Sequence, residues 1–290
     1  PRTRGLVSVH FFGFPQNTPA LRRWCDDRDL LFFEDCAHAF FGQAHGRPVG
    51  SYGHYAISSN TKFLPVYDGG VLTSAERSLD DIDMESPSWL YELKSLVNVV
   101  EFSVGFGRLG LARHLFAGLT RVKDAAWGVI KRARPQVTST VKPSLASEGS
   151  SDFDPDWMSR APSRWGQLLS AHIGAAGISA TRVANYDMLH ERLADAPGAR
   201  PLFGEWPPGA VPQVYPLLLE KPGPVFDQLK REGVPIIRYG DDRWDGPELA
   251  TCPWSTQLAD SVLQFPVHQD LRPDELRWIG DRVVAALEQA

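Results

Sequence analysis

The stretch "LLFFEDCAHAFFG", residues 30–42, opens with an apolar run that ends in two carboxylates, Glu34 and Asp35. A continuous apolar run of this length is typical of a strand that is covered on both faces of a parallel sheet. An ionised carboxylate that is buried without a partner costs several kcal/mol. We therefore expect each acid either to face solvent or to meet a positive group from elsewhere.

The residues before this run complete a strand-helix-strand unit. Residues 5–13, "GLVSVHFFG", are rich in β-formers and end in glycine, whereas residues 17–29, "NTPALRRWCDDRD", begin with capping residues and an early proline. Residues 5–35 are therefore predicted to form a βαβ unit of a parallel sheet. Ligands of such sheets collect at the carboxyl ends of the strands, and Asp35 lies at such an end.

The rest of the chain divides by the character of its sequence. Glycine-rich loops and short strands are predicted over 43–75, helices from about Ser86, a Ser/Thr/Pro-rich link over 136–156, one helix over 165–194, strands over 213–220 and 234–239, and helices over 224–233 and from Pro273. We predict an α/β protein in three parts: a mostly parallel large-domain sheet over 1–84, a helical insert and link over 85–164, and a smaller C-terminal α/β domain over 165–290.

Composition narrows the class of protein. The formal net charge of -5 gives no basic field for nucleic acid. No run approaches the roughly 18 to 20 apolar residues that span a bilayer. Cys25, Cys36 and Cys252 form neither a CxxC pair nor a disulfide framework, which favours a reducing cytoplasm. The chain begins without Met or a signal peptide and enters a strand within five residues, so we interpret it as a fragment.

A cationic partner for the carboxylates is found in "SSNTKFLPVYDGG", residues 58–70, where Lys62 follows Asp35 by 27 residues. An acid at a strand end and a lysine on a following loop are what a pyridoxal phosphate site requires. The lysine forms a Schiff base, and the acid keeps the pyridine nitrogen protonated. Asp35 would then be paired with a cation that the cofactor carries.

Five segments, in this order, resemble the DegT/StrS-type aminotransferases of nucleotide-sugar and antibiotic biosynthesis, which have the type I fold of pyridoxal phosphate enzymes. They are "VSVHFFGFP" (7–15), "FFEDCAHAFFG" (32–42), "GRPVGSYGHYAIS" (46–58), "TKFLPVYDGG" (61–70) and "SVLQFPVHQDLRPDELRWIGDRV" (261–283). The resemblance implies that Asp35 contacts the pyridine nitrogen and that Lys62 is the Schiff-base lysine and proton carrier. It places His38 near the ring oxygen of the cofactor.

The same resemblance implies that Ser58 helps to hold the cofactor phosphate. Three residues separate Ser58 from Lys62 where the family usually has four, so Ser59 is the alternative. The implied reaction moves an amino group from an amino acid, Glu or Gln, to a keto-sugar nucleotide or a related keto metabolite. The implied assembly is a homodimer.

The chain also departs from the family pattern. The phosphate-cradling turn and the ring-stacking aromatic would lie ahead of Pro1, and the Asn-Tyr-Arg-Met-like stretch that follows the lysine region has no counterpart. The alternative is therefore a non-catalytic or truncated member that acts as a binding or regulatory partner. A dehydratase is less favoured, because such members replace the lysine by histidine. We expect residues 1–290 alone to expose apolar strand faces, to bind the cofactor weakly and to aggregate, or to require a partner chain that carries the absent N-terminal part.

Three further patterns carry weaker alternatives. "GFGRLG" (105–110) matches a dinucleotide-binding fingerprint but lacks the following strand. The basic segment 108–134 would suit a helix on an anionic membrane or a partner protein, although a solvated helix is favoured. Four histidines show no metal-ligand spacing with cysteines or acids and are interpreted as turn or packing residues: His10, His45, His54 and His268.

Overall fold

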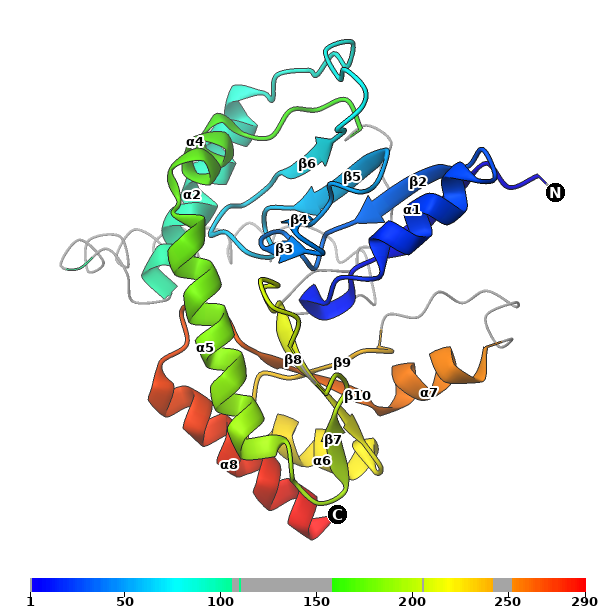
Figure 1. Ribbon diagram of the computed structural model, residues 1–290. Coiled ribbons are helices and arrows are strands. Elements are labelled where there is room, and N and C mark those ends of the chain that lie inside the picture. The colour runs from blue at the N-terminus through cyan, green and yellow to red at the C-terminus, as the bar shows by residue number, and fades with distance from the viewer. Residues whose placement is uncertain (1, 106–109, 111–157, 205, 242–251) are drawn as a thin grey trace, which may run out of the picture. The chain divides into compact units, whose positions relative to one another are not determined.

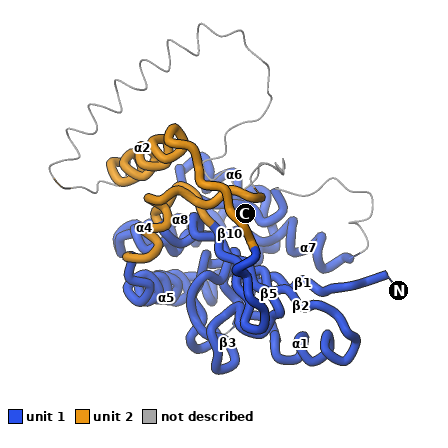
Figure 2. Tube along the Cα trace, turned by 90° about the horizontal axis from the view of Figure 1, so that it is seen from above, with its two compact units in different colours: residues 1–64, 70–81, 173–290 blue, residues 65–69, 82–172 orange. Residues whose placement is uncertain are grey.

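The computed structural model describes residues 2–105, 110, 158–204, 206–241 and 252–290 (Figure 1). The chain forms two compact units, coloured separately in Figure 2. One contains Pro1–Leu64, Gly70–Asp81 and Ile173–Ala290, and the other contains Pro65–Gly69 and Ile82–His172. The predicted three-part domain division stays a prediction. Within the described ranges, no helix is long and apolar enough to cross a membrane.

The first unit contains a four-stranded, mostly parallel sheet. Its strands lie in the order β1 (Gly5–Val9), β2 (Leu31–Asp35), β5 (Tyr55–Ser59) and β6 (Gly70–Thr73). The first three are parallel and β6 runs antiparallel to β5. A 3-10 turn, η1 (Phe11–Gly13), follows β1, and a short hairpin, β3 (Gln43–Ala44) and β4 (Arg47–Pro48), lies between β2 and β5.

Helix α1 (Thr18–Asp26) connects β1 to β2 and completes the predicted βαβ unit. The Asn17 side chain caps its first turn by accepting from the amide of Ala20 at 3.3 Å, and Pro19 lies in that first turn, where a missing amide costs nothing. Cys25, in the last turn of the helix, is fully buried. The strand-helix-strand prediction for residues 5–35 is therefore confirmed.

The two faces of this sheet differ in how they are covered. Successive strand side chains point to opposite faces. On one face Phe32 is fully buried and Glu34 is 1% exposed. On the other face three apolar side chains are open to solvent: Val7 is 62%, Ile57 50% and Leu72 42% exposed. The run 30–35 is thus covered on one face of the described structure.

A second sheet of the same unit is antiparallel throughout. Its order is β7 (Ala199–Pro201), β8 (Val214–Leu219), β10 (Val262–Pro266) and β9 (Ile237–Arg238). Four helices accompany it, α5 (Ala175–Leu193), α6 (Pro222–Arg231), α7 (Pro253–Ser261) and α8 (Pro273–Gln289). The last three begin with proline in the first turn. One apolar core joins this sheet to α5, α6 and α8, and Phe12 and Phe14 from the turn after β1 belong to it.

The second unit contains α2 (Trp89–Gly105) and α4 (Arg164–His172). The carboxylate of Asp68 accepts the backbone amide and the hydroxyl of Ser163 at 2.9 and 2.8 Å. The Ser163 hydroxyl also lies 2.7 Å from that of Ser95 on α2. These hydrogen bonds fix the start of α4 against α2.

Several secondary-structure predictions were wrong in detail. The single helix predicted over 165–194 is two helices, because Ile173 and Gly174 interrupt it and Gly174, with an extended backbone, forms the N-cap of α5. The strand predicted over 234–239 is reduced to two residues, and β7, α7 and β10 were not predicted. The predicted basic helix, the link and most of "GFGRLG" lie outside the described residues.

Candidate functional site

The candidate site lies at one edge of the parallel sheet. The segments that follow β1, β2 and β5 leave the sheet at the same edge, because the three strands are parallel neighbours. His10 and η1 follow β1, His38 follows β2, which ends at Asp35, and Lys62 follows β5, which ends at Ser59. This is the edge at which α/β proteins collect ligands.

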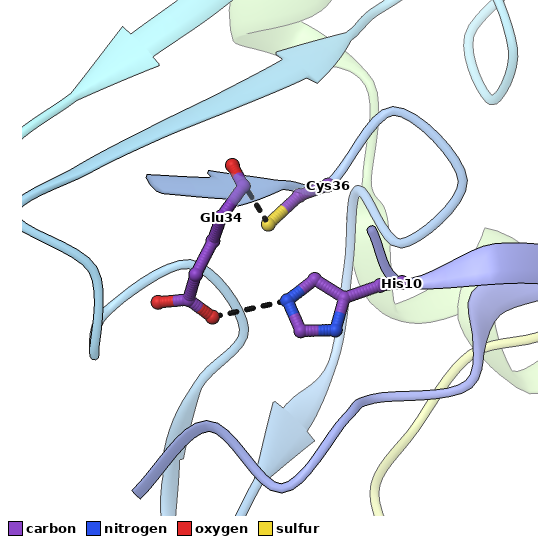
Figure 3. A group of neighbouring side chains, drawn as sticks. All are labelled: His10, Glu34 and Cys36. Carbon is purple, nitrogen blue, oxygen red and sulfur yellow. Dashed lines mark hydrogen bonds and ion pairs between the residues drawn. The ribbon is translucent and has the colours of Figure 1, made fainter. Parts of the chain in front are cut away.

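Glu34 is enclosed by hydrogen bonds on the covered face. One carboxylate oxygen lies 3.0 Å from Nε2 of His10 (Figure 3). The other oxygen accepts the backbone amides of Tyr52, at 2.7 Å, and Gly53. Burial alone would raise the pKa of this carboxyl. The hydrogen bonds from His10 and the two amides outweigh burial and hold the pKa below its usual value. Glu34 therefore has its partners within the chain.

His10 and Cys36 complete this buried cluster (Figure 3). One potential ligand atom from each of His10, Glu34 and Cys36 lies within 4.8 Å of the others, a spacing that could hold a metal ion. However, Nδ1 of His10 accepts the amide of Gln16 at 3.1 Å, which places the imidazole proton on Nε2, where it faces Glu34. Burial and the neighbouring acids raise the pKa of the Cys36 thiol. Both ring nitrogens of His10 and both carboxylate oxygens of Glu34 thus have hydrogen-bond partners within the chain.

Asp35 points to the opposite face of β2 from Glu34. Its Oδ1 accepts the amide of Ala37 at 2.9 Å, which turns the chain away from the sheet after the strand. This is the one hydrogen bond of its side chain among the residues that the structure describes. The Asp35 carboxylate is half-buried and retains acceptor capacity for a ligand.

His38 lies within electrostatic range of both Asp35 and Lys62. Burial and, to a smaller extent, the positive charge of Lys62 lower the pKa of the imidazole to about 4, and the charge of Asp35 partly opposes them. Nδ1 accepts the amide of Phe12 at 3.4 Å, so the proton of the neutral ring lies on Nε2. Phe12 has φ of 62°, a backbone conformation that is rare for a bulky residue. The predicted residues Asp35, His38 and Lys62 thus come together at this edge.

The two candidate serines point to different faces. Asp35 pairs with Ile57, so Ser59 lies on the face of Asp35 and Ser58 on the face of Glu34. Ser58 lines a cavity of about 180 Å³ together with Cys36 and Val71. The Ser59 hydroxyl lies 3.1 Å from that of Thr61. Neither serine's predicted contact with a phosphate is tested by this geometry.

Sequence reasoning missed two features of this edge. The pairing of His10 with Glu34 could have been suspected from the sequence. The βαβ prediction places their two strands side by side, and the alternation of side chains along each strand puts both residues on the same face. The contact of Arg182 with the Lys62 backbone had no sequence signal, since the two residues lie 120 positions apart. Only the tertiary fold brings them together.

Residues 1–85 match the model of the DegT/DnrJ/EryC1/StrS aminotransferase family. The UDP-N-acetyl-3-dehydro-alpha-D-glucosamine 3-aminotransferase of Acidithiobacillus ferrooxidans is 33% identical over 86 residues, which are 28% of this chain and 22% of that protein. The spore coat polysaccharide biosynthesis protein SpsC of Bacillus subtilis is 26% identical over 170 residues, 51% of this chain and 43% of that protein. The matches thus span about a fifth to less than half of these relatives' length.

Solved structures extend the likeness over the whole chain. The aminotransferase TlmJ from Streptoalloteichus hindustanus is 18% identical with a TM-score of 0.62, and DesV of S. venezuelae is 19% identical with a TM-score of 0.63. Each comparison covers 100% of this chain and 67% of the other. The α/β prediction with a mostly parallel sheet is confirmed, and the chain has the type I fold of these aminotransferases. Its first 85 residues carry the sequence pattern of the DegT/DnrJ/EryC1/StrS aminotransferase family.

Proposed function

We propose that this protein is a pyridoxal phosphate-dependent aminotransferase. The observation that carries the proposal is the convergence of Asp35, His38 and Lys62 at the carboxyl edge of the sheet, where the charges of both Asp35 and Lys62 act on the His38 ring. The family match over residues 1–85 contains all three residues.

These residues fit the cofactor by the chemistry of their side chains. A carboxylate with free acceptor capacity suits a protonated pyridine nitrogen, and an amine suits an aldehyde. The neutral imidazole of His38 offers its Nε2 proton to a ring oxygen. When bound, pyridoxal phosphate supplies an electron sink for negative charge at the substrate carbon.

Each side chain then has a separate task. Lys62 would hold the cofactor covalently and, once released, move a proton at the reacting carbon of the substrate. Asp35 would hold a proton on the pyridine nitrogen by its negative charge. His38 would orient the ring by a hydrogen bond and stay neutral near pH 7, because its pKa is about 4. For the phosphate we propose Ser59, which shares the face of Asp35.

For the substrates, we propose a keto-sugar nucleotide or a related keto metabolite as acceptor and an amino acid, Glu or Gln, as donor. The names of the relatives support this class: one acts on a UDP-linked dehydro-glucosamine, and another is a putative L-glutamine:3-amino-2,3-dideoxy-scyllo-inosose aminotransferase. A homodimer and a cytoplasmic setting belong to the same proposal. The three cysteines are free thiols, as in a reducing compartment. A non-catalytic role is not favoured, because several of the matching relatives are named as aminotransferases or transaminases.

Covalent labelling of Lys62 tests the proposed function. The protein is incubated with pyridoxal phosphate, reduced with borohydride and mapped by peptide mass spectrometry. We expect the label on Lys62, no label there in Lys62→Ala, and a loss of transamination of about 10³-fold or more in that variant. Lys221→Ala is the matched control, because the Lys221 amine contacts the backbone oxygen of Ala290 at the surface. A label that maps to another lysine in the wild type would overturn the assignment.

A further inference from the structure

Arg182 is the largest fully buried side chain of the described residues that carries a formal charge. It lies on α5, is 1% exposed, and its guanidinium contacts neutral acceptors within hydrogen-bond distance. In the part of the chain that the structure describes, no carboxylate is among its hydrogen-bond partners, so the burial of this cation is costly. Burial lowers the pKa of the guanidinium to about 10. Apolar residues of similar size would fill the same space at lower cost. The position of Arg182 therefore calls for a role other than packing.

The guanidinium contacts the segment that carries Lys62. One terminal nitrogen donates to the backbone oxygen of Lys62 at 3.2 Å, and the guanidinium carbon lies 4.6 Å from the centre of the Phe63 ring. The other terminal nitrogen donates to the backbone oxygens of Pro212 and Gln213 at 3.3 and 3.0 Å. Arg182 thus ties the Lys62 backbone to α5 and to the segment before β8.

Gln269 completes the contact. Its Oε1 accepts from Nε of Arg182 at 2.8 Å, and its Nε2 donates to the backbone oxygen of Phe63 at 3.0 Å. The carbonyls of two successive residues, Lys62 and Phe63, are therefore held by two side chains that are bonded to each other. Within the segment, the amides of Phe63 and Leu64 donate to the backbone oxygen of Asn60 at 3.1 and 2.8 Å. The loop after β5 is thus held by its own backbone hydrogen bonds and by the side chains of Arg182 and Gln269.

We propose that Arg182, together with Gln269, is a positioning residue that fixes the backbone of Lys62 so that its amine points to the candidate site. We call the contacts of Arg182 and Gln269 with the backbone of Lys62 and Phe63 the clamp. The task assigned to Lys62 rests on the proposed function, but the clamp itself is independent of the cofactor. A lysine cannot replace Arg182, because an ammonium is a compact point charge. The planar guanidinium contacts the Lys62 backbone oxygen, the Gln269 side chain and the backbone oxygens of residues 212 and 213 at the same time. A shift of about 1 Å in a reacting group can reduce the rate on the order of 10²-fold.

Two measurements on Arg182→Lys test the clamp, and Arg192→Lys is the matched control. Arg192 lies on the same helix and pairs with Asp281 at the surface. We expect hydrogen exchange at the amides of Phe63 and Leu64 to become at least about tenfold faster in Arg182→Lys. We also expect the rate of Lys62 labelling by pyridoxal phosphate and borohydride to fall by about tenfold, with both quantities unchanged in Arg192→Lys.

A second variant covers the case in which Arg182→Lys does not fold. Gln269→Met removes the bond to the Phe63 carbonyl and the acceptor of Arg182, and we expect faster exchange at the same two amides. Unchanged exchange and labelling in a folded variant would overturn the clamp. If the wild-type label lies on another lysine while exchange still responds to Arg182→Lys, the clamp stands and the proposed function fails.

Discussion

The two faces of strand β2 present two neighbouring carboxylates to different surroundings. On the covered face, Glu34 is 1% exposed and is bound by His10 and two backbone amides. On the other face, Asp35 has one local backbone amide, among the described residues, and apolar neighbours that are open to solvent. The chain satisfies the first acid by itself and leaves the second with acceptor capacity. On this difference we base the structural role proposed for Glu34 and the ligand-binding role proposed for Asp35.

Substitution of each acid by its amide, Asp35→Asn and Glu34→Gln, should separate these two roles most strongly. Asp35→Asn should reduce transamination by about 10²-fold or more, because a neutral amide cannot hold a proton on the pyridine nitrogen, while the free energy of unfolding changes by less than about 1 kcal/mol. Glu34→Gln should lower the free energy of unfolding by about 2 to 4 kcal/mol, because the new NH2 donor would face either the proton on Nε2 of His10 or the backbone amides of Tyr52 and Gly53. Urea unfolding and initial rates measure the two effects.

The reverse pattern would break the comparison. If Asp35→Asn unfolded the protein while Glu34→Gln left its stability intact, the structural and ligand-binding roles would have to be exchanged. If Asp35→Asn kept near wild-type turnover, Asp35 would not be the partner of the cofactor.

Much of the first sheet could be predicted from local sequence. The apolar run at residues 30–35 and the capped helix before it specify a βαβ unit, and the acid at the strand end then lies at the ligand edge. The second sheet was harder, because β9 has two residues and β7 three, and no periodicity can be recognised over such lengths. Their pairing is set by β8 and β10, which lie more than 40 residues apart in sequence.

The residues proposed to carry the chemistry of the candidate site could be predicted from the sequence, but the residues that hold the Lys62 segment in place could not. Asp35, His38 and Lys62 lie within 28 residues and follow the resemblance, whereas Arg182 and Gln269 reach the Lys62 segment from more than 100 residues away. The choice between Ser58 and Ser59 likewise needs the strand register, because a shift of one residue reverses the face.

The pKa of His38 gives the next largest expected effect. The imidazole pKa is about 4 in the folded protein and near 6.5 in the unfolded chain, so between these values only the unfolded chain takes up the proton. The free energy of unfolding should therefore fall as the pH is lowered from about 7, by about 2 kcal/mol at pH 5, and this loss should level off below pH 4. His38→Gln should remove that part of the pH dependence.

Urea unfolding at pH 7 and pH 5 measures this loss, with the exposed His172→Gln as control. The Glu34 carboxyl, whose pKa lies below its usual value, loses its contribution only at lower pH and so does not interfere between pH 7 and 5. An equal pH dependence in wild type and His38→Gln would mean that the ring is more solvated than the structure shows.

The smallest effect is expected on the open face of the first sheet. Val7 is 62% exposed, so Val7→Thr should change the free energy of unfolding by no more than about 0.5 kcal/mol. The same substitution at Val262, which is fully buried in β10, should cost about 1 to 3 kcal/mol, because it places a hydroxyl in the core. A double variant, Val7→Thr with Ile57→Thr, should also reduce self-association in light scattering, since exposed apolar patches promote association. Equal costs at Val7 and Val262 would show that the face of Asp35 is packed in solution, and the contrast between the two faces of β2 would then have to be abandoned.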